Sequence, residues 1–185
     1  EISDEVLLTA RRSEGRGREE MKAENRRRIL QVVLTLLTLL LNGWIFSNSL
    51  KTASESSSQS SKVRGWIQTF FDALFPGGGI EVSGHIIRKV AHFSEYALLG
   101  LMLYLTYRAY TAKKLWLWIP ALIGFVVPFC DEGLQFFSEG RAPALTDVGI
   151  DVSGAAFGML CGWGAVYVVC AIVRRRSRKR AEKNA

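Results

Sequence analysis

Side chains that can exchange protons, bind metals or hold anions gather where apolar stretches of this chain begin or end. His92 and Glu95 stand early in "VAHFSEYALLGLMLYLTY", Asp131 and Glu132 stand late in "LWLWIPALIGFVVPFCDEGLQFF", and Asp151 follows Leu145 within the last apolar stretch. Ionisable groups are costly inside hydrocarbon, so those found there are usually paired and functional. These positions are the candidates for chemistry, and the residue types favour proton transfer.

The elements that position these residues are apolar blocks separated from blocks of charge. The chain has 185 residues, is 49% hydrophobic and carries a formal net charge of +7. A bilayer core of roughly 30 Å needs about 20 apolar helical residues. Stretches of this kind predict spans over residues 29–47, 90–110, 115–137 and 145–173. The predicted fold is therefore all-α, an integral membrane four-helix bundle, and a soluble domain is excluded.

Basic residues predict the orientation of these spans. Arg26 to Arg28, Lys113 with Lys114, and "RRRSRKR" at 174–180 all fall on one side of a four-span chain. Basic loops stay in the cytoplasm, so both termini are expected there, in a bacterial cytoplasmic membrane. Lipid phosphates account for these basic runs, and no nucleic acid partner is expected.

This orientation divides the chain into a membrane domain, 29–173, between an N-terminal tail, 1–28, and a basic tail, 174–185. Met21 followed by Lys22 is a common start for a bacterial membrane protein, so residues 1–20 are expected to be a non-native extension.

The segment 48–89 is expected on the outer face. Its Ser-rich beginning has little reason to fold alone, whereas Val63, Trp66 and Phe70 recur at helical spacing. Too short to span, this amphipathic helix is predicted to lie in the extracytoplasmic interface. Arg88 and Lys89 also fall outside, against the charge bias, which indicates a local role.

Because consecutive spans alternate in direction, their polar ends are predicted to meet at the outer third of the membrane. Asp147 and Asp151 share one helical face at about 100° per residue. Gly158-x-x-x-Gly162 continues this face and allows a neighbouring helix to approach closely, so the two carboxylates are expected inside the bundle. Arg141 lies in the turn between the last two spans.

These residues also carry a family resemblance. "FSNSLKTASESSS", "RKVAHFSEYALLGLML" and "DEGLQFFSEGRAPALTDVGIDVSGAAFG", in this order, resemble the VanZ-like membrane proteins from about Ile29 to about Val169. The resemblance implies a multi-pass bacterial membrane protein linked to glycopeptide (teicoplanin) resistance. Carried over by position, its motif residues are Lys89, His92, Glu95, Asp131, Glu132, Gln135, Arg141, Asp147 and Asp151.

The first functional hypothesis is an enzyme, with hydrolysis or group transfer on an amphiphilic outer-leaflet substrate as the reaction class. The expected catalytic residues are His92, Glu95, Asp131, Glu132 and Asp151, with His92 as general acid or base and Glu95 orienting its ring. The expected substrate-binding residues are Lys89, Gln135, Arg141 and Asp147, of which the two cations suit a phosphate or carboxylate head group.

Other hypotheses stay open. The same groups could bind a membrane lipid, a lipid-linked or cell-wall precursor or a glycopeptide without catalysis, or form a purely structural charge network. A divalent metal ion on His92, Glu95, Asp131 and Asp151 is a further alternative. No cofactor is expected, because Lys89 and Arg141 can neutralise the carboxylates. The sequence leaves the oligomeric state open.

Overall fold

In a computed structural model, which describes residues 4–75, 81 and 83–183, the chain is all-α, as predicted. The described elements are α1 (Asp4–Ser49), α2 (Ala53–Leu74), α3 (Gly84–Tyr110), the 3₁₀ turn η1 (Lys114–Leu117), α4 (Trp118–Gln135) and α5 (Leu145–Lys183). No strand occurs among the described residues. Neither predicted tail boundary is a helix end, because α1 runs through residue 28 and α5 through residue 173.

Three helical segments of the described chain are long and apolar enough to cross a membrane: 14–49, 114–135 and 145–182. They contain the first and fourth predicted spans and all but the last two residues of the third, and make this an integral membrane protein. The second predicted span belongs to α3, which is not among them although its 27 residues suffice in length. Lys89, His92 and Glu95 reduce its apolar character, and α1, α4 and α5 pack around it.

The tightest packing in the bundle joins α3 to α5. A Cβ atom placed on Gly100 of α3 would stand 2.0 Å from the carbonyl oxygen of Ala155. On α5, a Cβ atom on Gly154 would stand 2.5 Å from the carbonyl oxygen of Phe93. Because glycine has no side chain, the two backbones can touch at these positions, as they do at small residues between other membrane helices. The predicted inward face of α5 is thereby confirmed.

The buried core continues this seam towards α1. It consists of Ile45, Tyr96, Leu99, Leu103 and Ala155. Polar contacts tie α1 to the far end of α3, where the hydroxyls of Thr38 and Thr106 lie 2.9 Å apart. The guanidinium of Arg27 donates to the backbone oxygen of Tyr110 at 3.1 Å. α1 therefore holds α3 along most of its length, which leaves α3 the central helix.

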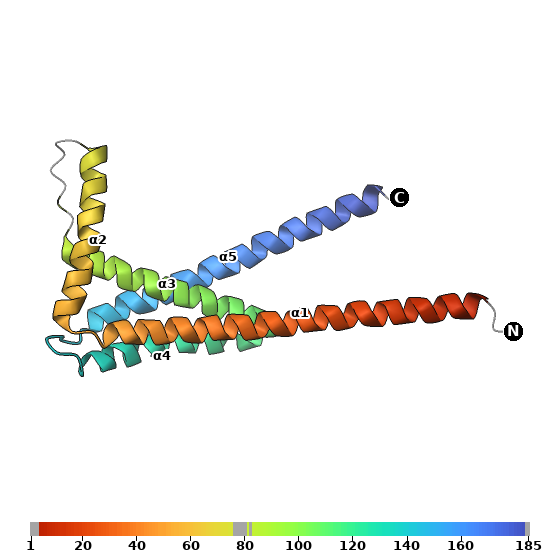
Figure 1. Cartoon of the computed structure of the whole chain (residues 1–185), viewed down its shortest axis with the longest axis horizontal. Helices are drawn as coiled ribbons and strands as arrows, with labels where there is room; N and C mark the ends of the chain where they lie inside the picture. Colours follow the sequence, from red (N-terminus) through yellow and green to blue (C-terminus); the bar gives the residue numbers. More distant parts are fainter. Residues whose placement is uncertain (1–3, 76–80, 82, 184–185) are drawn as a thin grey trace.

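The helix α2 differs from its prediction. It stands across the direction of α1, near the turns that join the other helices (Figure 1). It begins at Ala53, so the Ser-rich segment expected to lack structure is part of it. The backbone N–H of Ala53 donates to the oxygen of Glu139 at 3.1 Å, and α2 also contacts α3. The second part of α2 was predicted as a helix, whereas its Ser-rich first part was not.

Candidate functional site

A cavity of about 160 Å³ opens between the first turns of α3, the loop 136–144 and the first turns of α5. It lies at the end of the bundle near α2, opposite the N-terminal end of α1 and the C-terminal end of α5 (Figure 1). Its lining combines cationic, imidazole and carboxylate groups: His85, Arg88, Lys89, His92, Gly140, Arg141, Ala142, Asp147, Ile150 and Asp151. The predicted meeting of polar residues from α3 and α5 is therefore present.

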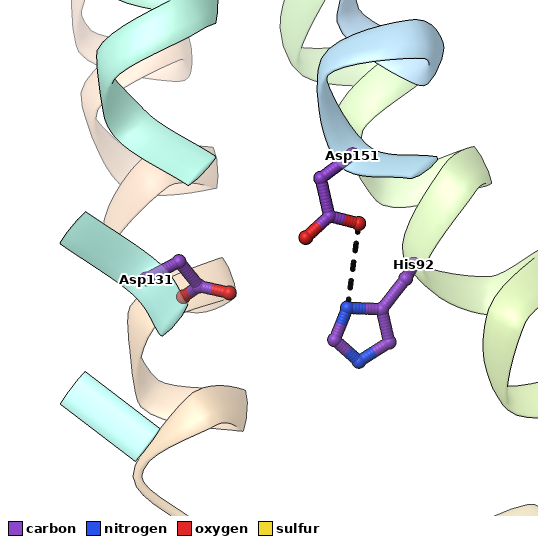
Figure 2. Close-up of side chains that lie close together, drawn as sticks. All are labelled: His92, Asp131 and Asp151. Atoms are coloured by element: carbon purple, nitrogen blue, oxygen red, sulfur yellow. Dashed lines mark ion pairs between the residues drawn. The ribbon is translucent and has the colours of Figure 1, made fainter. Parts of the chain in front are cut away.

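At the inner end of this cavity, three helices bring His92, Asp131 and Asp151 together. One ligand-type atom of each lies within 4.8 Å of the others. The Nδ1 atom of His92 faces Oδ1 of Asp151 at 3.5 Å, and Figure 2 shows the Asp131 carboxylate reaching towards the same space from α4. Asp131 and Asp151 are 0% exposed. These three residues therefore converge in the folded chain, as predicted.

Lys89 and Asp147 form an ion pair at the rim of the cavity. The Nζ atom of Lys89 lies 3.3 Å from Oδ1 of Asp147, and both side chains are about one-third exposed. An ion pair this exposed contributes about 0–1 kcal/mol to stability, so it leaves Lys89 available to exchange Asp147 for another anion. These two predicted substrate-binding residues do line the cavity.

Arg141 extends from the loop 136–144 and ties it to the end of α1. Its guanidinium donates to the backbone oxygens of Ser49 at 3.3 Å and of Asn48 at 3.4 Å. Burial, reinforced by the nearby Arg88, lowers the pKa of Arg141, but an arginine in a protein remains charged. Arg141 therefore brings a fixed positive charge to the cavity while closing the loop onto α1.

Glu132 and Gln135 form a separate buried pair at the end of α4. The amide of Gln135 donates to Oε2 of Glu132 at 2.8 Å, and the backbone N–H of Ala144 donates to Oε1 of Glu132. Both carboxylate oxygens of Glu132 thus have donors, and the contact with Ala144 joins the end of α4 to the approach to α5. Glu132 and Gln135 are close to the cavity without being among its lining residues.

Glu95 lies one turn beyond His92 on α3 and contacts α1. Its Oε1 atom accepts a hydrogen bond from the amide of Asn48 at 3.4 Å. Glu95 does not belong to the group formed by His92, Asp131 and Asp151 within the described chain. Of the residues considered for a metal ion, the geometry therefore keeps three and leaves Glu95 outside.

Residues that the sequence reasoning missed come mainly from the end of α1 and the start of α3. Asn48 and Ser49 hold Arg141 through their backbone oxygens, and the Ser49 oxygen also accepts from the hydroxyl of Ser138 at 2.8 Å. His85 lines the cavity and was missed, whereas Arg88, which also lines it, was expected to have a local role. The polar run "SNS" directly after an apolar span was the available signal for Asn48 and Ser49.

The fold and this site define a class, an all-α membrane protein with a buried histidine–aspartate group beneath a cation-lined cavity. The sequence profile of the VanZ/LLP1 family matches residues 29–169. The chain belongs to the VanZ/LLP1 family, as the resemblance of its motifs implies. No curated protein and no solved structure was found to match it.

Proposed function

We propose that this VanZ/LLP1 family protein binds an amphiphile by its anionic head group and acts on it at the outer face of the membrane. The observation that carries this proposal is the composition of the cavity. Arg88, Lys89 and Arg141 bring positive charge to its walls, while His92 and Asp151 stand at its inner end. A pocket lined by cations favours anionic groups through charge-assisted hydrogen bonds.

Arg88 is the cation best placed to bind the head group. Its side chain forms no hydrogen bond or ion pair with another residue of the described chain. Lys89, by contrast, pairs with Asp147, and Arg141 holds the end of α1. Lys89 and Asp147 would separate when an anion enters, and Gln135 would support the site from α4. The head group would thus be held by Arg88, Lys89 and Arg141.

The membrane arrangement supports a cavity open to the outer leaflet. In the proposed topology α3 is a fourth crossing, so that α1, α3, α4 and α5 form the four-helix bundle and α2 lies in the extracytoplasmic interface. The N-terminal end of α1 and the C-terminal end of α5 lie away from the cavity, at the opposite end of the bundle (Figure 1), in agreement with an even number of crossings. Basic residues at those ends favour a cytoplasmic location for both termini, in a bacterial cytoplasmic membrane.

The reaction class proposed for this site is hydrolysis or group transfer on a lipid-linked or other cell-envelope substrate. His92 and Asp151 would form its reactive end, with Asp131, Glu95 and Glu132 as the surrounding carboxylates. A non-catalytic binder of the same head group is the second candidate, because the cavity favours an anion whether or not a bond is broken. Either activity would alter access to cell-wall precursors and so contribute to glycopeptide resistance.

The proposal is tested with purified protein in phosphatidylcholine nanodiscs, titrated with a polyprenyl diphosphate and followed by native mass spectrometry. Arg88→Gln should weaken binding about tenfold or more, because one charge-assisted hydrogen bond contributes about 1.5–3 kcal/mol. Lys113→Gln, three residues beyond the opposite end of α3, is the matched control and should leave binding unchanged. Equal binding by both variants would refute the cavity as the head-group site.

Catalysis and binding are separated with the same preparation. Incubation of the bound lipid followed by chromatography should reveal a cleaved or transferred product with the unchanged protein and none with His92→Asn. If the unchanged protein binds the lipid and yields no product, the non-catalytic binder is the correct function. In cells, a deletion strain complemented with His92→Asn should keep the teicoplanin sensitivity of the deletion.

A further inference from the structure

Two buried carboxylates at the inner end of the cavity lack hydrogen-bond partners. Asp131 of α4 and Asp151 of α5 are both 0% exposed. None of their four oxygens accepts a hydrogen bond within the described chain, and Nδ1 of His92 has no hydrogen-bond partner there either. Buried polar groups are nearly always satisfied in native proteins, and an unpaired buried charge is strongly unfavourable. This group therefore needs either protons on its carboxylates or a compensating positive charge.

The neighbouring cations Lys89 and Arg141 make their direct contacts with other groups. Lys89 pairs with Asp147 at 3.3 Å, and Arg141 donates to the backbone oxygens of Ser49 and Asn48. Neither Lys89 nor Arg141 makes a direct contact with Asp131 or Asp151, although the positive charge of Arg141 acts on Asp131 across the site. Among the cationic groups of the described chain, only His92 forms an ion pair with either carboxylate, and one imidazolium cannot balance two carboxylates.

We infer that His92, Asp131 and Asp151 bind one divalent transition-metal ion at the inner end of the cavity. The side chains come from three different helices and converge on one space (Figure 2). One imidazole nitrogen with carboxylate oxygens is a ligand set that suits Mn²⁺, Fe²⁺ or Zn²⁺. The inference deepens the proposed function, since the ion would occupy the reactive end of the same site.

The separations fit a shared ion better than direct contacts. Hydrogen bonds between charged nitrogen and oxygen groups are about 2.7–2.9 Å long, whereas Nδ1 of His92 and Oδ1 of Asp151 are 3.5 Å apart. Bonds of about 2.0–2.2 Å to one tetrahedral ion place two ligand atoms about 3.4 Å apart. All three atoms lie within 4.8 Å of one another, so binding of an ion would require side-chain rotations that bring them closer.

An open coordination position follows from the position of the cavity. His92 and Asp151 line the cavity, whereas Asp131 is not one of its lining residues. An ion held by these side chains would have protein ligands on the buried side and free access from the cavity. Catalytic metal sites have this arrangement, with three protein ligands and a position left for water or substrate. The anionic head group held by Arg88 and Lys89 would reach the ion from that side.

The test uses the tag-free full-length protein in nanodiscs, stripped with a chelator and titrated with MnCl₂ or ZnCl₂. Elemental analysis after removal of free metal should give one ion per chain, and the temperature of unfolding should rise with metal concentration. Because even an outer-shell partner accounts for about 10- to 100-fold in metal affinity, Asp131→Asn and Asp151→Asn should each weaken binding about 100-fold or more. Glu139→Gln changes an exposed acidic residue in the loop 136–144. It is the control and should leave the metal affinity unchanged.

The metal-free variants distinguish loss of a ligand from loss of the fold. Asparagine has the shape of aspartate and removes an unpaired buried charge, so both metal-free variants should unfold at or above the temperature of the metal-free parent. Metal should then stabilise the parent and not the variants. Absence of saturable binding by the folded parent, or binding unaffected by both substitutions, would overturn the inference. Polyprenyl diphosphate binding in chelator is measured in parallel, so that failure of the metal site and failure of the proposed function are separate outcomes.

Discussion

Gly158 of α5 lies directly against the backbone of Ala97 in α3: a Cβ atom placed on Gly158 would stand 1.8 Å from the Ala97 carbonyl oxygen. This contact lies two helical turns from Asp151 and little more than one turn from His92, further along α5 and α3 respectively. The approach of the two backbones therefore determines how closely the His92 and Asp151 side chains face one another. The glycine seam is part of the site although it has no chemistry of its own.

Gly158→Ala should destabilise the bundle, because the added methyl group forces the two backbones apart. Overpacking of this kind is unfavourable by about 1–3 kcal/mol, partly offset by the higher helix propensity of alanine. Gly164→Ala in the same helix is the matched control, since a Cβ there meets nothing within 4 Å. Thermal unfolding in detergent should rank Gly158→Ala below the parent and Gly164→Ala at or above it. Equal stability of the two variants would show that the seam tolerates a side chain.

Cysteine labelling tests whether α3 crosses the membrane. In a background in which Cys130, Cys161 and Cys170 are replaced by alanine, Glu139→Cys should react with an impermeant maleimide in intact cells. Lys113→Cys should react only after permeabilisation. If α3 stayed on the outer surface, α4 would cross in the opposite direction and the two labelling patterns would be exchanged.

Two substitutions of Glu132 separate its structural contacts from its expected chemistry. Glu132→Ala leaves the N–H of Ala144 and the amide of Gln135 without their acceptor, which should lower stability by about 1–3 kcal/mol. Glu132→Gln keeps an acceptor for Ala144, and the Gln135 amide can turn to pair with it, so its stability should stay near that of the parent. Loss of activity in a stable Glu132→Gln protein would support a catalytic carboxylate.

The comparison needs a control for charge removal at this end of the bundle. Glu139→Gln changes an exposed acid in the neighbouring loop and should alter neither unfolding temperature nor activity. If Glu132→Gln unfolds as readily as Glu132→Ala, the carboxylate is needed for the fold, and the loss of activity says nothing of catalysis.

Acid should loosen the start of α2. Hydrogen bonds from the backbone N–H of Thr52, at 2.9 Å, and from its hydroxyl, at 3.0 Å, hold the pKa of Glu55 below its usual range. The N–H of Glu55 donates back to the Thr52 hydroxyl, a reciprocal cap of the helix. A carboxyl whose pKa is lower in the folded state stabilises that state above its usual pKa, and this stabilisation is lost as the pH falls through the folded value.

Amide exchange, corrected for intrinsic rates, measures this effect. Protection of the first turn of α2 should decrease as the pH is lowered through the acidic range. Glu55→Gln should show weaker protection at neutral pH and little further loss in acid. A first turn in the parent that exchanges independently of pH would contradict the cap.

The helices of this chain and the polar residues at their ends can be predicted from the pattern of residues within each helix. The apolar runs around Ile45 and Leu99, the inward glycines of α5 and the polar positions at the helix ends depend only on helical period and hydropathy. Those features predicted the all-α fold, the membrane location and a meeting of His92 with Asp151. The start of α2 was not predicted: its cap by Thr52 and Glu55 is local, whereas its contact with Glu139, a residue distant in the sequence, exists only in the folded chain.

The sequence by itself determined which side chains lie at the polar ends of the helices, because depth along a helix is simple counting. Which of those side chains share one space was decided only by the tertiary structure, through the rotation and close approach of α3, α4 and α5 about the glycine seam. Asp131 and Glu132 are adjacent acidic residues that the sequence alone does not distinguish. In the structure, Asp131 lies near His92 without a hydrogen-bond donor, whereas Glu132 accepts hydrogen bonds from Ala144 and Gln135. Side chains of neighbouring residues in a helix point about 100° apart. The packing of helices that are distant in sequence determines which of these two side chains faces His92.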